Sequence, residues 1–278
     1  MLEPLLRYAG AIALGYAVGR LTRRRPPQWA YTPLVAALIF FVAANASRVV
    51  LGNLGLFLAV SLAYAAALVL MTAAIGSLFD RSTSYEAVGR PAISLYAVAA
   101  MALGLAVGYY ASLDYGVAID PLLITLLLVA GADMAGVKIR LERKTLAAPA
   151  VSLVAATVVA PLFTAAFKIT PAVAYGLGWY SFTGPYLAGA GDAAGGAYGL
   201  LVNFFREQLT FVLAPLLARR FGRVGVLAAG GATTMDNTLP LYVALYGPSF
   251  SIYAFANGVL LTLIVPIVVP AVHQLYVA

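Results

Sequence analysis

The sequence predicts an all-α polytopic membrane protein, and its composition and its series of apolar segments both support this fold class. Of its 278 residues, 63% are hydrophobic and only 10% are charged, values that soluble globular domains of ordinary composition do not approach. The mean hydropathy is +0.95. At about 20 residues per crossing helix, the chain has room for roughly eight to ten spans and almost no extramembrane domain. Residues 1–278 are therefore predicted to form a single integral membrane domain.

Charge and cysteine content exclude several other classes of protein. The net charge of +7 arises from short basic clusters between apolar segments, so it indicates membrane topology and no nucleic-acid partner is expected. Cysteine is absent, and the single histidine, His273, lies among the last residues. We therefore expect no disulfide, no metal or other cofactor, and a protein that is not an enzyme.

Ten apolar segments follow one another along the chain. The first, residues 4–20, precedes its basic cluster Arg23 to Arg25, which is the reverse of a secretory signal. We expect a membrane helix that begins outside and keeps these arginines in the cytoplasm. The later segments are expected at residues 29–46, 54–79, 92–112, 119–137, 145–166, 171–190, 195–217, 224–246 and 250–274.

The basic clusters predict which of these segments cross the membrane. Loops after the first, third and fifth segments are basic, as expected for cytoplasmic loops, but the cluster Arg219, Arg220 and Arg223 breaks the parity. One earlier segment therefore does not cross fully. Segment 171–190, rich in Gly and Pro, is predicted to be a re-entrant hairpin entered from outside. Segment 224–246, which Gly and Pro also interrupt, is predicted to be one entered from inside.

Two broken segments of opposite orientation, each followed by a continuous apolar segment, predict an inverted repeat. The sequence thus predicts about eight transmembrane helices plus two re-entrant, broken-helix hairpins, with both termini outside. N-terminal helices would occupy residues 1–170, and two hairpin-plus-helix elements over residues 171–278 would carry the site. The alternative is ten ordinary Gly-rich helices, which are common in membrane proteins.

Acidic residues inside apolar segments are the first candidates for function, because an ionisable group at membrane depth is costly. They are Asp133, Asp192, Glu207 and Asp236. Asp236 lies among the polar neighbours Thr233, Thr234 and Asn237. A broken helix there would leave backbone groups free for a ligand. The alternative is a carboxylate that only caps a half-helix.

Two further side chains, Asn203 and Asn45, could line a polar path together with Glu207. Asn203 precedes Glu207 by four residues, so both are expected on the same side of a helix. The alternative for Glu207 is an ion pair or a helix contact. Asn45, in the second segment, is expected either to hydrogen-bond across helices or to line the path.

A protease is a remote alternative, because Gly189-Ala-Gly-Asp192 matches the GxGD pattern of intramembrane aspartyl proteases. Such an enzyme needs a second aspartate nearby, so that two carboxylates share one proton. The candidate partner in an apolar segment is Asp133, but the residue before it is not the tyrosine that precedes the aspartate in these enzymes. We expect instead that Asp192 ends the first hairpin and that Asp133 pairs with Lys138 or Arg140.

Three motifs in the second half of the chain resemble the LysO family of lysine exporters. In order, they are Gly178-Trp-Tyr-Ser-Phe-Thr-Gly184, then Phe204-Phe-Arg-Glu207 with Pro215 and Arg219-Arg220 behind it, then Gly231-Ala-Thr-Thr-Met-Asp-Asn-Thr-Leu-Pro240. Their order and spacing are closely similar to those of the family. The resemblance is tight over about residues 178–240 and loose over the rest of the chain.

The resemblance implies export of L-lysine, and of analogues such as thialysine, across the cytoplasmic (plasma) membrane in exchange for protons. Asp236 stands at the family's intramembrane aspartate. A second functional acid of bacterial members lies toward the end of the second segment, where residues 45–53 contain no acid. This departure leaves the identity of the proton carrier open.

The chemistry of lysine then defines the candidate site. An ammonium group suits a carboxylate and an aromatic face, and an α-carboxylate suits a helix N-terminus. The expected set is Asp236, Glu207, Thr233, Thr234, Asn237, Asn203, Trp179, Tyr180, Ser181, Thr183 and Asn45. The alternative for Trp179 and Tyr180 is an interfacial aromatic belt. We expect alternating access around two crossed hairpins, with protonation of Asp236 competing with bound lysine.

The expected partners are L-lysine, protons and the lipid bilayer. Na⁺ is an alternative coupling ion, because Thr and Asn oxygens also suit a cation, and a homodimer is compatible with the sequence. The alternative function is a cation- or proton-coupled transporter of another small substrate.

Overall fold

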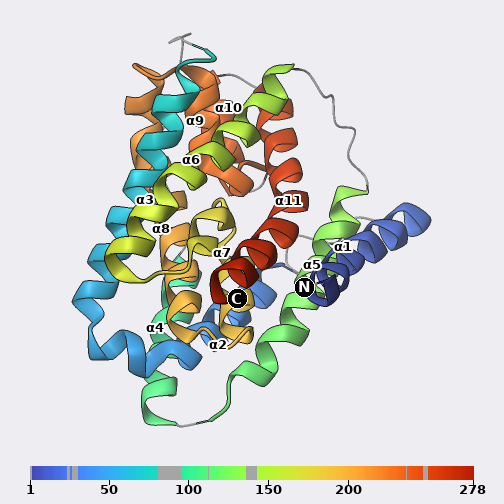
Figure 1. The fold of residues 1–278 in the computed structure, drawn as a ribbon. Coiled ribbons are helices and arrows are strands. Elements are labelled where there is room, and N and C mark those ends of the chain that lie inside the picture. The colour runs from blue at the N-terminus through green and yellow to red at the C-terminus, as the bar shows by residue number, and fades with distance from the viewer. Residues whose placement is uncertain are drawn as a thin grey trace.

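The computed structural model describes residues 2–23, 26, 31–80, 95–111, 113–135, 143–235, 237–246 and 250–278. Within these ranges every regular element is helical (Figure 1). The long helices are α1 Leu2–Thr22, α2 Tyr31–Gly52, α3 Leu54–Gly76, α4 Leu95–Tyr110, α5 Gly116–Met134, α6 Arg143–Phe167, α8 Ala193–Ala218 and α11 Ser251–Val277. Between them lie two broken segments. One consists of the 3₁₀ turn η2 Pro171–Gly176 and α7 Tyr180–Gly189, the other of α9 Gly222–Gly230, the 3₁₀ turn η3 Gly231–Met235 and α10 Leu239–Tyr246.

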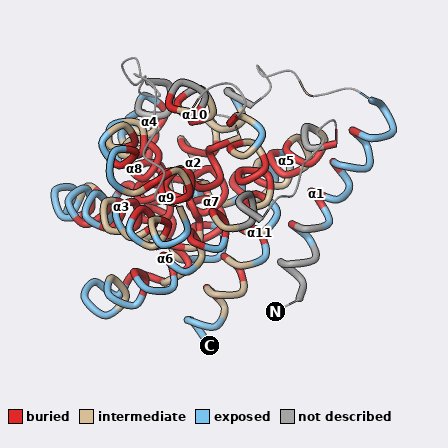
Figure 2. Tube along the Cα trace, turned by 90° about the horizontal axis from the view of Figure 1, so that it is seen from above, coloured by how far each residue is buried: buried red, intermediate tan, exposed pale blue. Residues whose placement is uncertain are grey.

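Length and surface chemistry confirm the predicted all-α polytopic membrane class. Five helices of the described part are long and apolar enough to cross a membrane, and two shorter ones are apolar. Large aliphatic side chains point outward from them, such as Leu70 on α3, Leu162 on α6 and Val212 on α8. Figure 2 shows long exposed stretches on the outer helices around a buried centre. Because these outward faces are apolar, they suit lipid rather than water. The number of full crossings and their sidedness stay predictions.

Glycine pairs spaced by three residues bring two pairs of helices into close contact. Gly15 and Gly19 on α1 lie against the backbone of α5, and Gly104 and Gly108 on α4 lie against that of α2. A side chain at any of them would overlap a backbone oxygen of the neighbouring helix. Small residues at this spacing let membrane helices pack closely where no hydrophobic force drives them together.

Two helix boundaries differ from the sequence-based expectation. The second segment, expected to end at residue 46, continues as α2 to Gly52, and a single residue, Asn53, separates it from α3. The fifth segment, expected at residues 119–137, begins earlier, as α5 at Gly116, so Asp120 lies inside the helix. Its carboxylate accepts a hydrogen bond from Tyr8 at 2.8 Å and forms an ion pair with Arg7. Asp120 therefore ties α1 to α5.

The first broken segment begins and ends beside the C-terminal end of α11. At its start, Tyr276 donates to the carbonyl of Lys168 at 3.3 Å, and Thr170 Oγ1 lies 3.2 Å from His273 Nδ1. Near its end, the ring of Tyr186 meets the His273 ring edge-on at 6.2 Å. The chain therefore enters the bundle, reverses direction and returns to the same end (Figure 1).

The second broken segment begins and ends beside the N-terminal end of α11. The guanidinium of Arg223, in the first turn of α9, lies 5.6 Å from the ring centroid of Tyr246 at the end of α10. Tyr246 in turn contacts Phe250, just before α11, with ring centroids 4.7 Å apart. The two broken segments thus enter the bundle from opposite ends, with α9 and α10 in the upper half of Figure 1 and α7 in the lower half. Their relation to a membrane stays a prediction.

Candidate functional site

The two broken segments touch at their turns. The backbone N–H of Ala232 donates to the carbonyl of Leu177 at 2.9 Å. Leu177, Gly178 and Gly231 all have positive φ, of 49°, 95° and 62°, so both turns use the conformation that favours glycine. A side chain at Gly231 would overlap the Leu177 carbonyl. The crossing therefore depends on a residue without a Cβ at that position.

Helix α8 passes the crossing and brings three polar side chains to it, about midway along its length. Asn203, Arg206 and Glu207 are at most 1% exposed. Each of them meets a different part of the broken segments, because successive residues of a helix point in different directions.

Asn203 holds the first turn. Its Oδ1 accepts the N–H of Gly178 at 2.7 Å, and its Nδ2 donates to the carbonyls of Val173 and Gly199 at 3.0 and 2.9 Å. The amide oxygen and one amide hydrogen are thus used on backbone groups of the first broken segment, and the other hydrogen on a carbonyl one turn earlier in α8. This arrangement makes Asn203 a residue that positions the turn.

Arg206 holds the second turn. Its Nε donates to the carbonyl of Ala229 at 3.0 Å and its Nη2 to that of Ala228 at 2.9 Å. Both carbonyls belong to the last turn of α9, where carbonyls lack the usual partner within the helix, and that of Ala228 also accepts from the Ser152 hydroxyl at 2.9 Å. Its Nη1 is buried and has no hydrogen-bond partner among the described residues.

Glu207 meets the second broken segment through Asn237. Asn237 Nδ2 donates to Glu207 Oε2 at 2.9 Å, and Gln208 Nε2 donates to Oε1 at 3.0 Å. Two amides thus bind a carboxylate that is 1% exposed, while Asn237 itself is exposed. The structure therefore brings together two predicted site residues that are distant in sequence.

The hydroxyls of Thr233 and Thr234 bond within their own turn. Thr233 donates to the carbonyl of Gly230 and Thr234 to that of Gly231, each at 2.9 Å. Asn257 of α11 reaches into this turn, and its Nδ2 donates to the Gly231 carbonyl and to Thr234 Oγ1, each at 2.9 Å. Sequence reasoning missed Asn257; the signal was an amide in the middle of a long apolar segment.

The aromatic pair lies inside the molecule, next to the first turn. Tyr180 is 4% exposed and packs edge-on against Phe204 at 5.7 Å. Trp179, half-buried, contacts Phe182 at 5.3 Å. Thr183 donates to the carbonyl of Trp179 at 2.9 Å. Ser181, in the same helix, is buried as well. This placement favours the crossing over an interfacial belt as the position of Trp179 and Tyr180.

One predicted site residue, Asn45, is not brought into this group, and another is not described. Asp236 lies outside the described residues, between Met235 and Asn237. Asn45 is half-buried on α2, and α2 packs on α4, α5, α7 and α8. No hydrogen bond joins Asn45 to the crossing in the described part of the chain.

The geometry argues against the aspartyl protease. Asp192 caps the N-terminus of α8, where its Oδ1 accepts the N–H of Gly195 at 2.7 Å, as expected for a residue that ends the first hairpin. Asp120 on α5 lies at the same end of the bundle, because its partner Tyr8 contacts Tyr186. The backbone of Asp133 is a further thirteen residues along α5, about 20 Å at the rise of a helix. Position 133 of the chain therefore lies near the opposite end of α5 from Asp192.

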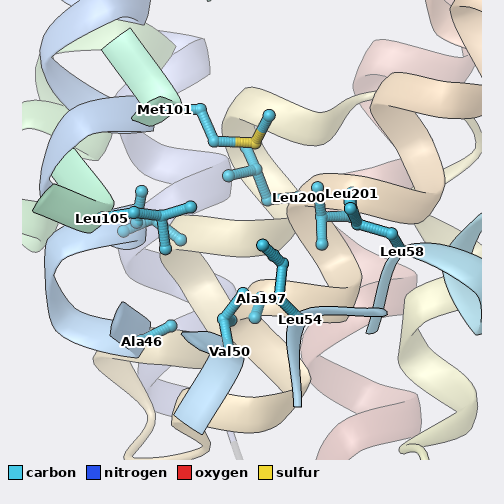
Figure 3. Close-up of a pocket in the computed structure, with 11 residues that line it drawn as sticks. Ala46, Val50, Leu54, Leu58, Met101, Leu105, Ala197, Leu200 and Leu201 are labelled. Carbon is cyan, nitrogen blue, oxygen red and sulfur yellow. The ribbon is translucent and has the colours of Figure 1, made fainter. Parts of the chain in front are cut away.

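An apolar pocket between α2, α3, α4 and α8 does not suit a charged substrate. Figure 3 shows aliphatic side chains and Met101 around it, among them Val50, Leu105 and Leu200. A pocket without polar groups suits a hydrocarbon chain. The candidate site among the described residues is therefore the crossing.

Comparison with known proteins adds a family to this geometry. The family model described as "Lysine exporter LysO" matches residues 98–273, more than half of the chain. The protein named "Lysine exporter LysO" of Escherichia coli (strain K12) is 36% identical over 98 residues, which are 35% of this chain and 32% of that protein. The alignment thus spans about a third of that relative. No solved structure matches the chain significantly.

Proposed function

Because the chain belongs to the lysine exporter LysO family, we propose that it exports L-lysine across the cytoplasmic membrane as a secondary active transporter. The observation that carries the proposal is the buried carboxylate of Glu207, held by the amide of Asn237 where the broken segments cross. A carboxylate inside a membrane bundle marks a substrate or ion pathway by default. Broken helices at the same place supply backbone groups for a ligand.

The substrate's charges fit this group of side chains. Lysine carries two ammonium groups and one carboxylate, and Glu207 and Asp236 would receive the ammonium groups. The faces of Trp179 and Tyr180, next to the first turn, would bind a cation at the ring. Thialysine, which keeps all three charges, would use the same contacts.

Export would proceed by alternating access with proton antiport. Lysine and protons compete for the same carboxylates, so release of one would accompany binding of the other. Asp236 would be the main proton carrier and Glu207 a second one, since residues 45–53 contain no acid. Both termini would lie outside.

Binding of lysine tests this proposal. We expect lysine to raise the thermal unfolding temperature of the purified protein in a dose-dependent way, because a ligand of the folded state stabilises it. Glutamate, with the opposite net charge, serves as the control. An unfolding temperature that lysine does not change would contradict the proposed substrate.

Na⁺ coupling is the second candidate, and Asn257 is the observation in its favour. Asn257 Oδ1 is buried without a partner among the described residues, and the other atom of the same amide contacts the Gly231 carbonyl and Thr234 Oγ1. Hard cations prefer such oxygen ligands. A rate of lysine transport that depends on a Na⁺ gradient at constant pH would favour Na⁺ coupling. A rate that does not depend on it would favour proton coupling.

A further inference from the structure

Arg206 is a buried charge for which no described residue supplies a counter-charge. It is 0% exposed and lies near the middle of α8, a helix long and apolar enough to span a membrane. No carboxylate of the described residues lies within ion-pair distance of its guanidinium. The neighbouring Glu207 is bound by amides and not by Arg206. The carbonyls at the end of α9 offset part of the cost of burying this cation, and an anion beside it would offset more.

Its donors are used only in part. The planar guanidinium carries five N–H donors, and the structure uses Nε and one hydrogen of Nη2 on the carbonyls of Ala229 and Ala228. Nη1 has no acceptor among the described residues, and Nη2 makes one hydrogen bond there, so the edge that these two nitrogens form has donors left. This edge has the spacing that matches the two oxygens of a carboxylate.

Holding the end of α9 does not by itself require a charge. A neutral amide also donates to backbone carbonyls, as Asn203 does at the first turn. What distinguishes an arginine at the second turn is its permanent positive charge and its free, carboxylate-shaped edge.

We propose that the free edge of Arg206 binds the α-carboxylate of the transported amino acid. This inference rests on the proposed function and adds the basis of its selectivity. Acidic residues alone recognise ammonium groups and would accept a diamine as readily as lysine. A guanidinium on the same helix as Glu207 demands a carboxylate at a fixed place, so the substrate class becomes α-amino acids with a cationic side chain.

Substrate analogues test the proposal on the unmodified protein. The probes are lysine, lysinamide, in which a neutral carboxamide replaces the carboxylate, and cadaverine, which lacks the group. We expect purified protein to bind lysine at least about tenfold more tightly than either analogue, since a charged hydrogen-bonded pair is lost. If lysinamide bound within about twofold of lysine, the proposal would be overturned. That result would indicate that Arg206 binds only the carbonyls of α9 or another anion such as Asp236.

The Arg206→Gln variant localises the effect. Glutamine keeps a donor for the α9 carbonyls and removes the charge, so we expect lysine to lose its advantage over cadaverine. Arg220→Gln, at an exposed arginine just after α8, serves as the control and should keep the wild-type ratio. A folded Arg206→Gln protein that keeps the wild-type ratio would overturn the proposal, as a purely structural role predicts. If Arg206→Gln does not fold, the binding of lysine, lysinamide and cadaverine to the unmodified protein tests the proposal by itself.

The same experiment separates this inference from the proposed function. Absence of lysine binding to the wild-type protein would contradict both. Lysine binding without discrimination against lysinamide would leave lysine export standing and would remove only the role of Arg206.

Discussion

Ala232 donates its backbone N–H to the carbonyl of Leu177 at 2.9 Å, and this bond joins the turns of the two broken segments. Helix α8 holds both turns, the first through Asn203 and the second through Arg206. Hydrogen bonds join the turns to each other and to α8. A movement of one broken segment would therefore displace the other. The polar side chains between them form the candidate site.

The first prediction concerns Gly231. Its positive φ and its contact with the Leu177 carbonyl leave no room for a side chain. We expect Gly231→Ala to lower the free energy of unfolding by about 3 kcal/mol, through backbone strain and overlap. Thermal unfolding in detergent measures it. Gly189→Ala is the matched control, because a Cβ there meets no atom within 4 Å. Equal stability of the two variants would contradict the observed crossing.

The second prediction concerns Asn203. Replacement by Leu removes the partners of the Gly178 N–H and the Val173 carbonyl, both buried. Since each unpaired buried group costs about 1–3 kcal/mol, we expect the variant to be less stable by about 3 kcal/mol.

Thr210→Val provides the comparison on the same helix. The Thr210 hydroxyl is buried and donates to the carbonyl of Arg206 one turn earlier. Its loss should cost less than about 1 kcal/mol, because that carbonyl keeps its helical environment. If Asn203→Leu were no more destabilising than Thr210→Val in the same unfolding assay, Asn203 would not hold the turn.

Local sequence chemistry predicted the fold well. Gly and Pro in segments 171–190 and 224–246 indicated broken helices, and the breaks occur at Leu177–Gly178 and Gly230–Gly231. These residues act through their own φ and ψ, so a sequence reveals them. The start of α5 at Gly116 was missed by three residues, because it depends on a local turn in which Asp114 Oδ1 accepts the N–H of Gly116 at 3.0 Å.

The site was only partly predictable. Glu207 and Asn237 stood out as polar residues in apolar surroundings, but their contact joins segments that are distant in sequence. Arg206 and Asn257 donate hydrogen bonds to backbone carbonyls. Because every residue has a carbonyl, a sequence pattern does not show which carbonyl each side chain contacts. Both residues nevertheless carried the signal of polarity inside an apolar helix.

The third prediction concerns Glu207. Glutamine keeps the size and a carbonyl oxygen for the Asn237 amide, so Glu207→Gln should remain folded. It loses the charge that would bind an ammonium group, and we expect lysine binding to weaken at least about 30-fold. Calorimetric titration of purified protein with lysine measures this change.

Asp192→Asn is the control for Glu207→Gln, because asparagine caps a helix as well as aspartate does. Its lysine affinity should stay within about twofold of the wild type. If Asp192→Asn lost lysine binding while Glu207→Gln retained it, the site would lie at the start of α8 and not at the crossing.

Proton-driven lysine efflux from proteoliposomes tests the central claim most directly. Vesicles loaded with labelled lysine should release it at least about fivefold faster when the outside is made acidic, since inward proton flow drives lysine outward. A protonophore should remove the acceleration, and Asp236→Asn should abolish it in a protein that still folds in the membrane. Two results would contradict lysine–proton exchange at the crossing. One is a rate of efflux from wild-type vesicles that does not depend on the proton gradient, and the other is an acceleration in Asp236→Asn vesicles equal to that of the wild type.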